Sequence, residues 1–510
     1  MTQYFSTKFI TDFIDKTTMY RLLIYVLTGL LAVAFVLGFF KIVPHDPTQI
    51  AFSTVVVLVA CGLTNWVFAK IFRTPANFES PYITALIIAL IMNPVAATDY
   101  AGLGGLISAS VWAIASKFIL AIGRKHLFNP AAFGVAATAL LLNQPATWWV
   151  AGNLALLPFV LVGGLLIARK LQRFDLIVTF IAVNLVTVLA TSTPGNYVSS
   201  LTETVLHSPL FFFAFVMLTE PLTAPQAKWP RLAYAAIVGV LSAPNIHFGD
   251  FYLTPEIALL VGNVFTYAVS PKGKFALTLV RIEEAGAGAY DFVFKSDRRL
   301  KFRPGQYLEW TLGFKHPDNR GNRRVFTIAS APTENEVRLG VKFYPEASSF
   351  KRALAAMEPG DEIFASQLGG EFVLPKDAGK KLAFIAGGIG ITPFRSMLQD
   401  MIDREDRREV VVLYGNAKAA DIAYKDVLDR AQRELGIKTV YAAAAETRPI
   451  NGVQPGFIDA NMIRTQVPDY RERTFYVSGP HPMVTLLKRT LREMGVSPLR
   501  IKTDFFPGLA

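Results

Sequence analysis

The sequence contains very little cysteine and histidine. Its 510 residues include one cysteine, Cys61, so the chain can form no intrachain disulfide. A single cysteine also cannot hold an iron–sulfur cluster or a structural zinc ion. The six histidines stand singly, and none lies in the middle of an apolar segment facing another, which argues against a transmembrane haem with two histidine ligands. We therefore predict no metal site.

Charge is scarce in the first half of the chain. Residues 1–270 hold 14 of the 51 Lys and Arg residues and 10 of the 39 Asp and Glu residues. The mean hydropathy of the whole chain is +0.36, which is high for a soluble protein. Together with the uneven distribution of charge, it indicates that residues 1–270 form a membrane domain and that the charged remainder is soluble. The net charge of +12 is spread over both parts, which favours cytoplasmic loops and a solvated surface over a nucleic-acid partner.

The membrane part contains ten apolar segments, several of them shorter than the roughly 20 residues of a full membrane span. Short segments flanked by proline indicate broken helices. If the N-terminus is inside, Lys41 is the only basic residue of the external loops, so the charge distribution supports ten crossings. We predict a multi-pass protein of the bacterial inner (cytoplasmic) membrane, with the N-terminus and the C-terminal half in the cytoplasm. The segments are about 19–40, 49–69, 81–92, 102–122, 131–143, 149–168, 176–192, 209–219, 232–243 and 255–270.

A faint internal repeat divides this part into two halves. Ser-Pro and X-Pro dipeptides bound the short segments 80–94 and 208–221, and a further X-Pro follows at Asn129 and at Thr254. The matched pairs fall on opposite sides of the membrane, which predicts two inverted repeats around a polar site. Chance similarity remains an alternative for a pattern this thin.

Two motifs in this part carry a family resemblance. The runs HLFNPAAFGVAATALLL (126–142) and FFFAFVMLTEPLTAP (211–225) resemble the flavin-binding membrane proteins of the sodium-translocating NADH:quinone reductase and of the Rnf complex. The resemblance covers about 40–270 and implies about ten helices in two inverted halves that bind a flavin. It points to Asn129, Glu220 and Thr223 as membrane-flavin residues. Asn129 followed by proline is also an ordinary helix N-terminus, and Glu220 an ordinary interfacial residue.

The chain departs from that family in one respect. The resemblance implies a Ser-Gly-Ala-Thr motif that attaches FMN covalently, and the corresponding region, NYVSSLTETVLHS (196–208), does not contain it. Thr202 and Thr204 are poor substitutes. We therefore predict a non-covalent flavin, FMN or riboflavin, in the membrane domain.

The soluble part changes pattern near its middle. Five β-rich segments separated by turns, 275–284, 290–296, 306–314, 325–331 and 337–345, predict an antiparallel β-barrel. After residue 376, strand-like runs alternate with helical runs, which predicts a parallel, Rossmann-like α/β sheet. We expect three domains: a membrane domain (1–270), a β-barrel (274–375) and an α/β domain (376–510).

Two glycine-containing turns end strands of the predicted parallel sheet. Gly387, Gly388 and Gly390 stand where a buried strand leads into a helix, and YVSGPHPM (476–483) ends another strand. Glycine lets the backbone approach a pyrophosphate, and a helix N-terminus favours negative charge. The two turns would share one crevice at the sheet edge.

The soluble part also resembles the ferredoxin-NADP reductase family. FRPGQYLEW (302–310), RRVFTIAS (323–330), SSFKRAL (348–354), PGDEI (359–363) and LGGEF (368–372) follow the order of that family's motifs. The resemblance implies FAD bound in the barrel. Arg324 would hold the pyrophosphate, Phe326 would stack on the isoalloxazine, Thr327 would hydrogen-bond near N5, and Ser349 would cap a helix and touch the pyrophosphate. Core packing of Phe326 and a plain helix cap at Ser349 are the structural alternatives.

The same resemblance assigns the nicotinamide side. Phe506 would shield the flavin, with Phe505 as an equal candidate. Alanines in YAAAAETR (441–448) favour NADH, although Arg448 leaves NADPH open. The implied catalytic residues are Thr327, Ser478 and Thr392, and the implied cofactor contacts are Gly387, Gly388, Gly390, Thr392, Pro393, Gly479 and Pro480.

Together these features predict a membrane-bound flavoprotein oxidoreductase. Electrons would pass from NAD(P)H through FAD into a flavin-binding membrane domain, and from there to an extracytoplasmic FMN-binding protein or a quinone. Three alternatives remain open: the same electron flow coupled to Na⁺ or H⁺ pumping, a haem-type ferric reductase, and a non-enzymatic transporter or channel with a nucleotide-sensing domain.

Overall fold

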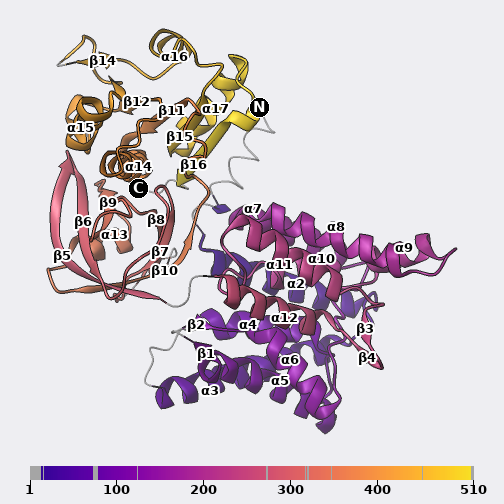
Figure 1. Ribbon diagram of the computed structural model, residues 1–510. Coiled ribbons are helices and arrows are strands. Elements are labelled where there is room, and N and C mark those ends of the chain that lie inside the picture. Colours follow the sequence, from indigo (N-terminus) through magenta and orange to yellow (C-terminus); the bar gives the residue numbers. More distant parts are fainter. Residues whose placement is uncertain are drawn as a thin grey trace. The chain divides into compact units, whose positions relative to one another are not determined.

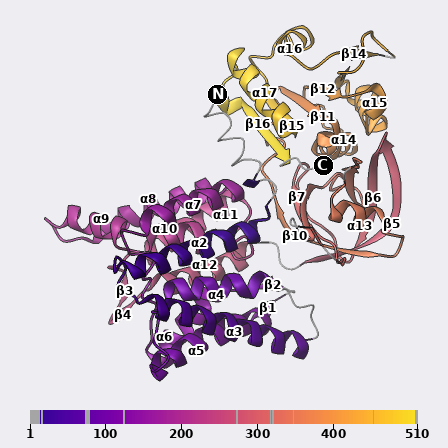
Figure 2. The same cartoon turned by 180° about the vertical axis from the view of Figure 1, so that it is seen from behind.

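The computed structural model describes residues 13–14, 17–72, 79–122, 125–270, 274–315, 317–318, 321–345, 347–450 and 452–506. The chain divides into two compact units, Met1–Gly273 and Lys274–Ala510. Figures 1 and 2 show the first as a bundle of helices and the second as two sheets with helices. The predicted boundary between 375 and 376 separates the two sheets, which lie within the one second unit.

Each predicted apolar segment of the first unit contains a helix, and α9 is an additional one. The largest shift concerns segment 149–168, where the helix begins at Leu157. Two-residue strands β1 (Ala121–Ile122) and β2 (Lys125–His126) form one small hairpin, and β3 (His247–Phe248) and β4 (Phe251–Tyr252) form another. The helices are α2 (Met19–Phe39), α3 (Pro47–Ile71), α4 (Glu79–Ile91), α5 (Tyr100–Ile119), α6 (Pro130–Leu142), α7 (Leu157–Leu171), α8 (Phe174–Thr191), α9 (Tyr197–Leu206), α10 (Leu210–Phe212), the π-helix η1 (Phe213–Met217), α11 (Lys228–Leu241) and α12 (Pro255–Val269).

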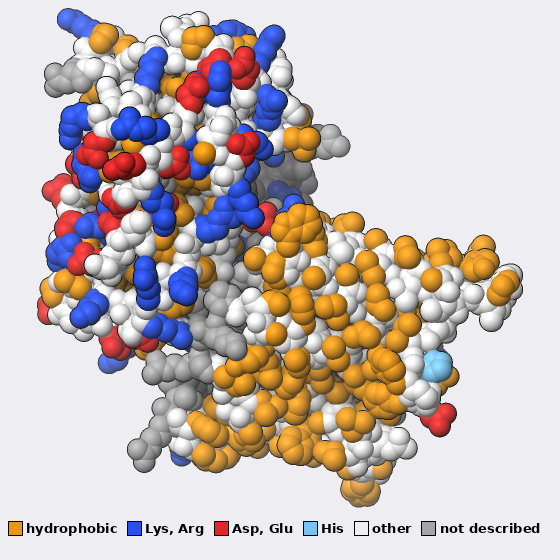
Figure 3. Space-filling model, in the orientation of Figure 1, with side chains coloured by type: hydrophobic (Ala, Val, Ile, Leu, Met, Phe, Trp, Pro, Cys, Tyr) orange, Lys and Arg blue, Asp and Glu red, His pale blue; other side chains and the backbone are white. Residues whose placement is uncertain are grey.

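Helix length and hydropathy identify the candidate membrane spans of the first unit. Among the described residues, α2, α3, α5 and α8 are long and apolar enough to span a membrane, and α9 with the α10–η1 segment forms a pair bent by 56°. Apolar side chains cover much of the visible face of the first unit, whereas Lys, Arg, Asp and Glu are frequent on the second (Figure 3). The first unit therefore has the surface of a multi-pass membrane protein. The ten crossings and the inverted repeats stay predictions.

Six antiparallel strands of the second unit form a curled sheet in the order β8-β7-β10-β5-β6-β9. No ladder joins β8 to β9 among the described residues, although the Ala329 N–H donates to the Arg338 carbonyl oxygen (2.9 Å) beyond the end of β8. The predicted barrel is therefore a half-open one. Its elements are β5 (Phe275–Gly286), β6 (Ala289–Ser296), β7 (Tyr307–Thr311), β8 (Arg323–Thr327), β9 (Val337–Lys342), α13 (Ser349–Ala355) and β10 (Glu362–Gly369).

The other sheet is parallel, in the order β14-β13-β12-β11-β15-β16. Buried side chains of α14 and α15 pack on one face and those of α16 and α17 on the other, so both faces are covered. The elements are β11 (Leu382–Gly387), η2 (Gly388–Ile391), α14 (Thr392–Asp403), β12 (Val410–Asn416), η3 (Ala419–Asp421), α15 (Lys425–Leu435), β13 (Lys438–Ala443), β14 (Val453–Pro455), α16 (Ala460–Gln466), β15 (Thr474–Pro480), α17 (His481–Glu493), η4 (Pro498–Arg500) and β16 (Ile501–Phe506).

Candidate functional site

The parallel sheet has a topological switch point between β11 and β15. The strands that follow β11 in the chain, β12 to β14, extend the sheet on one side, while β15 and β16 extend it on the other. Ligands of open α/β sheets bind in the crevice at such a point, beyond the carboxyl ends of the strands. Both glycine-containing turns that the sequence singles out stand at this crevice, where β11 leads into η2 and β15 leads into α17.

The two turns approach each other more closely than side chains would permit. A Cβ atom on Gly390 would lie 2.6 Å from the Cα atom of Gly479, and one on Gly387 would lie 2.2 Å from the Met483 sulfur. Gly388 has a φ of +52° and nothing within 4 Å of its added Cβ, so its backbone borders open space. The two turns can approach each other because Gly387 and Gly390 have no side chains, and the open space beside Gly388 leaves room for a ligand.

Two predicted catalytic residues, Thr327 and Ser478, have buried hydroxyl groups. Among the described residues, neither Thr327 Oγ1 nor Ser478 Oγ has a hydrogen-bond partner. Thr327 ends β8 of the curled sheet, and Ser478 lies in β15 of the parallel sheet. An unpaired buried hydroxyl costs free energy, so both groups are suited to a bound polar ligand.

Thr392 and Pro393 open α14 immediately after the glycine turn. Both residues are buried, and the Thr392 hydroxyl donates to the Ile389 carbonyl oxygen (3.2 Å). Pro480 is exposed at the end of β15. The nicotinamide contacts predicted for these residues and for Gly479 remain predictions.

Phe326 lies in β8 beside Thr327 and is only partly buried. Its ring packs against that of Phe350, with the centroids 5.9 Å apart. It therefore belongs to the edge of the core and keeps part of its surface for stacking.

Arg324, Ser349 and a residue that sequence reasoning missed, Asp318, form one anion-centred cluster. Arg324 Nη2 lies 3.4 Å from Asp318 Oδ1, the Ser349 N–H donates to Asp318 Oδ2 (3.1 Å), and the Asp318 N–H donates to Ser349 Oγ (2.9 Å). The helix cap, however, is Ser348, which accepts from the Lys351 N–H (3.3 Å), so the prediction that Ser349 caps the helix is wrong. The donors that meet the Asp318 carboxylate suit a diphosphate equally well.

The C-terminal strand β16 carries a second residue that the sequence reasoning missed. Asp504 pairs with Ser478 in the β15–β16 ladder, and burial raises the pKa of its carboxyl to about 7. Phe506 pairs with Pro480 through the backbone, and its side chain, like that of Phe505, lies outside the described residues. The acidic residue directly before two phenylalanines in the terminal strand was the available signal for Asp504.

The raised pKa of Asp504 predicts a stability that falls with pH. Between about pH 4 and pH 7 the folded chain keeps a proton that the unfolded chain has lost, so the free energy of unfolding decreases by about 1.4 kcal/mol per pH unit. Asp504→Asn should melt with the wild type near pH 4 and at a higher temperature at pH 8. Melting of the full chain in detergent, followed by FAD fluorescence, measures both curves. Parallel curves would contradict the burial of this carboxyl.

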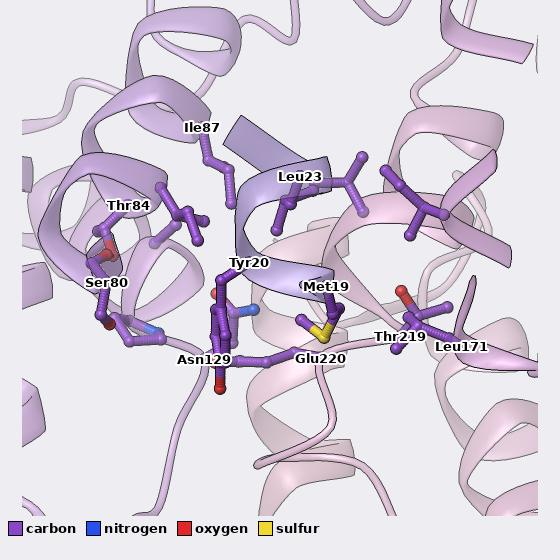
Figure 4. Close-up of a pocket in the computed structure, with 15 residues that line it drawn as sticks. Met19, Tyr20, Leu23, Ser80, Thr84, Ile87, Asn129, Leu171, Thr219 and Glu220 are labelled. Carbon is purple, nitrogen blue, oxygen red and sulfur yellow. The ribbon is translucent and has the colours of Figure 1, made fainter. Parts of the chain in front are cut away.

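The first unit contains a pocket of its own, with about 580 Å³ of empty space including the part open to solvent. Figure 4 shows Ser80 and Thr84 from α4 on one side of it and Leu171 and Thr219 on the other. Its lining comprises Met19, Tyr20, Leu23, Ser80, Ile83, Thr84, Ile87, Asn129, Pro130, Ala131, Ile167, Leu171, Val216, Thr219 and Glu220.

The three predicted membrane-flavin residues meet at this pocket. Asn129 and Glu220 line it, and the Thr223 hydroxyl donates to Glu220 Oε2 (2.8 Å). Glu220 Oε1 also lies 3.3 Å from His126 Nε2. Asn129 caps α6 by accepting from the Ala132 N–H (3.1 Å), so its cap role is confirmed alongside its place in the wall.

Two further polar residues near the pocket are engaged. Asn263 Oδ1 accepts from the Asn129 N–H (2.8 Å), a contact between helices distant in sequence. Lys117 Nζ donates to Ser80 Oγ (3.0 Å) and Thr84 Oγ1 (2.9 Å), both of which belong to the lining. An ammonium group inside an apolar segment is costly unless it is hydrogen-bonded, and these hydroxyls accept hydrogen bonds from it.

Two comparisons with known families agree with the predicted resemblances. Residues 384–489 match the oxidoreductase NAD-binding domain, and residues 142–271 match the NQR2, RnfD, RnfE family. These matches confirm both resemblances and the oxidoreductase class of the second unit. The second match includes Glu220 and Thr223 and leaves Asn129 outside it.

Curated relatives cover about 40% of this chain. A flavohemoprotein of Bacillus thuringiensis subsp. konkukian is 27% identical over 215 residues, 40% of this chain and 53% of that protein. An NADPH oxidoreductase of Mycobacterium tuberculosis is 29% identical over 201 residues, 38% of this chain and 50% of that protein. The chain thus spans about half the length of these relatives. The cytochrome b5 reductase domain of Ulva prolifera nitrate reductase is 22% identical, with 46% of this chain and 98% of that chain covered and a TM-score of 0.42.

Proposed function

We propose that this chain, which joins a reductase-like unit to a unit similar to the NQR2, RnfD, RnfE family, is an oxidoreductase of the bacterial inner membrane. It would take electrons from NAD(P)H through FAD into a flavin bound in the helical unit, and pass them to an extracytoplasmic FMN-binding protein or a quinone. The observation that carries the proposal is the presence, in one chain, of a switch point of the parallel sheet where two glycine turns meet and of a pocket of the helical unit lined by Asn129 and Glu220.

The residues of the second unit would bind and orient the reactants. FAD, when bound, accepts two electrons as a hydride and releases them singly. Arg324 and Ser349 would hold its pyrophosphate in place of Asp318, and Phe326 would stack on its ring. The hydroxyls of Thr327 and Ser478 would orient the flavin and the nicotinamide, and Thr392 would close the nicotinamide pocket.

In the helical unit the pocket would hold the second flavin without a covalent bond. Thr202 and Thr204, the substitutes considered for a covalent threonine, donate their hydroxyls to backbone carbonyl oxygens within α9. The pocket mixes apolar walls with a few polar groups, as sites for planar cofactors do. Asn129 and Glu220 supply the polar edge for the hydrogen-bonding part of the ring.

The direct test is to reconstitute the full chain in lipid nanodiscs and titrate it with NADH. Two flavins should be released by acid precipitation, FAD and FMN or riboflavin, and NADH should bleach both. Bleaching of FAD with no second flavin present would contradict the membrane half of the proposal. An FAD that NADH does not bleach would contradict the other half.

Filling the membrane pocket should remove the second flavin selectively. Leu171 lines the pocket at the end of α7 and is partly buried, so Leu171→Trp places an indole in the empty space. Leu165 on the same helix is 52% exposed and does not line the pocket, which makes Leu165→Trp the matched control. We expect the flavin content of the helical unit to fall by about tenfold or more in Leu171→Trp alone, because the indole would occupy space that the flavin needs. Equal content in both variants would place the flavin elsewhere.

A further inference from the structure

The junction between the two sheets of the second unit holds a buried ionic cluster. Asp291 of β6 is 2% exposed, and Arg395 of α14 is 6% exposed. Arg395 forms an ion pair with Glu334 and donates to the Ala329 carbonyl oxygen (3.1 Å). Among the described residues, the buried Arg395 Nε has no hydrogen-bond partner, so the remaining hydrogen bonds of the cluster are the ones that hold these charges in place.

Tyr424 connects the parallel sheet to this cluster. Its hydroxyl donates to Asp291 Oδ1 (2.7 Å), and Arg338 Nη1 donates to Asp291 Oδ2 (3.0 Å). Tyr424 has a φ of +56°, a left-handed conformation that is rare outside glycine. Burial raises the pKa of Tyr424 well above its ordinary value, so the hydroxyl stays protonated and remains a donor at neutral pH.

Gly340 of β9 is the point where this contact meets the predicted nicotinamide site. A Cβ atom at Gly340 would lie 2.2 Å from Tyr424 Oη and 2.7 Å from Thr392 Cγ2. The side chains of Tyr424 and Thr392 therefore both rest against the same residue of the curled sheet. One turn further along α14, the Ser396 hydroxyl donates to the Ser330 carbonyl oxygen (2.6 Å), three residues beyond Thr327.

We propose that Tyr424, held by Asp291, is a positioning residue that seats Thr392 and the first turn of α14 against the curled sheet and thereby sets the distance of hydride transfer. The inference rests on the proposed function, because it concerns NADH-dependent reduction of FAD. Tyr424 acts through Thr392, and Gly340 provides the close approach that lets it do so. A displacement of about 1 Å between reacting atoms is enough to lower a rate by about two orders of magnitude.

Tyr424→Phe in the full chain tests the proposal. It removes the hydroxyl that bonds Asp291 and keeps the ring in the junction. Stopped-flow bleaching of FAD by NADH, and by NADH deuterated at the transferred position, reports hydride transfer directly. We expect the rate to fall by about tenfold or more, the affinity for NADH to stay unchanged, and the deuterium isotope effect to rise.

Two further variants complete the experiment. Tyr441→Phe is the control, because the Tyr441 hydroxyl lies 3.4 Å from Asp429 Oδ1 within the parallel-sheet region, and it should behave as the wild type. Gly340→Ala adds the crowding methyl group and should reproduce the kinetic change of Tyr424→Phe with Tyr424 intact.

The outcomes separate the inference from the function on which it rests. Wild-type rates and isotope effects in Tyr424→Phe and Gly340→Ala would overturn the inference and leave the proposed function intact. Loss of FAD from both variants would show that the cluster only maintains the fold, which also overturns it. If NADH does not bleach the FAD of the wild type, the proposed function fails, and the inference fails with it.

Discussion

Arg324→Ala is expected to yield a protein that no longer retains FAD through purification. Arg324 stands in β8 with its guanidinium 5.2 Å from the centre of the Phe350 ring and directed at the Asp318 carboxylate, which suits the binding of a diphosphate. Each hydrogen bond to a charged group contributes about 1.5–3 kcal/mol. Loss of two such bonds weakens FAD binding by about 3 kcal/mol or more, which is about a hundredfold in Kd.

Arg323→Ala is the matched control for this prediction. Adjacent residues of a strand point to opposite faces, and Arg323 lies 3.6 Å from Glu309 Oε1 on β7. The control removes the same charge from the same strand and should bind FAD as the wild type does. FAD content of the purified chains and fluorescence titration of the stripped proteins measure the difference. A Kd for Arg324→Ala within a few-fold of the control would remove Arg324 from the pyrophosphate site.

The fold of the second unit could be predicted because its signals are local. Alternation in the β-rich segments and the strand–helix alternation after residue 376 each depend on neighbouring residues, and both sheets formed as expected. The strand β10 was missed because its two flanking motifs were interpreted as turns and family signatures. The edge strand β14 contains three residues, too few for a periodic pattern to stand out, and β16 was missed because Phe505 and Phe506 were interpreted as residues that shield the flavin.

The contacts that complete the sites could not be predicted in the same way. Tyr424 and Asp291 are separated by 133 positions, and Asn129 and Asn263 by 134. A separation this long gives no indication in a single sequence that two residues are in contact, since only the fold brings the partners together. The cap at Ser348 rather than Ser349 depends on the φ and ψ angles of one residue, which composition does not determine.

The number of membrane crossings could not be predicted for a different reason, which is the length of the helices. Apolar content predicted every helix of the first unit listed above except α9, but α4, α6 and α12 contain 13, 13 and 15 residues. Helices this short do not by themselves reach across a bilayer, which needs about 20 residues. Whether each crosses or re-enters depends on its packing, which hydropathy does not report. The number of crossings therefore stays a prediction, although α4 and α6 both contribute residues to the pocket of the first unit.

Gly390→Ala is expected to abolish reduction by NADH while leaving FAD in place. The added methyl carbon would lie 2.6 Å from Gly479 Cα, 2.7 Å from Gly479 N and 2.7 Å from the Ser478 carbonyl oxygen. All three are backbone atoms of the neighbouring turn, so no flexible side chain can yield, and the turns must move apart by several tenths of an ångström or more. Overpacking of this kind costs about 1–3 kcal/mol, and the same displacement disturbs the reacting geometry.

The distortion in Gly390→Ala falls on the nicotinamide side alone, because the FAD residues Arg324 and Phe326 belong to β8 of the other sheet. We therefore expect kcat/KM for NADH to fall by about a hundredfold, with a normal FAD content that dithionite still reduces. Gly436→Ala is the control: Gly436 has a φ of +70° and no atom within 4 Å of an added Cβ, so it carries backbone strain of about 1 kcal/mol without a clash. If both variants oxidise NADH at the wild-type rate, the two turns do not form the nicotinamide crevice. If Gly390→Ala instead loses its FAD, the close approach of the turns supports the whole unit and not the crevice alone.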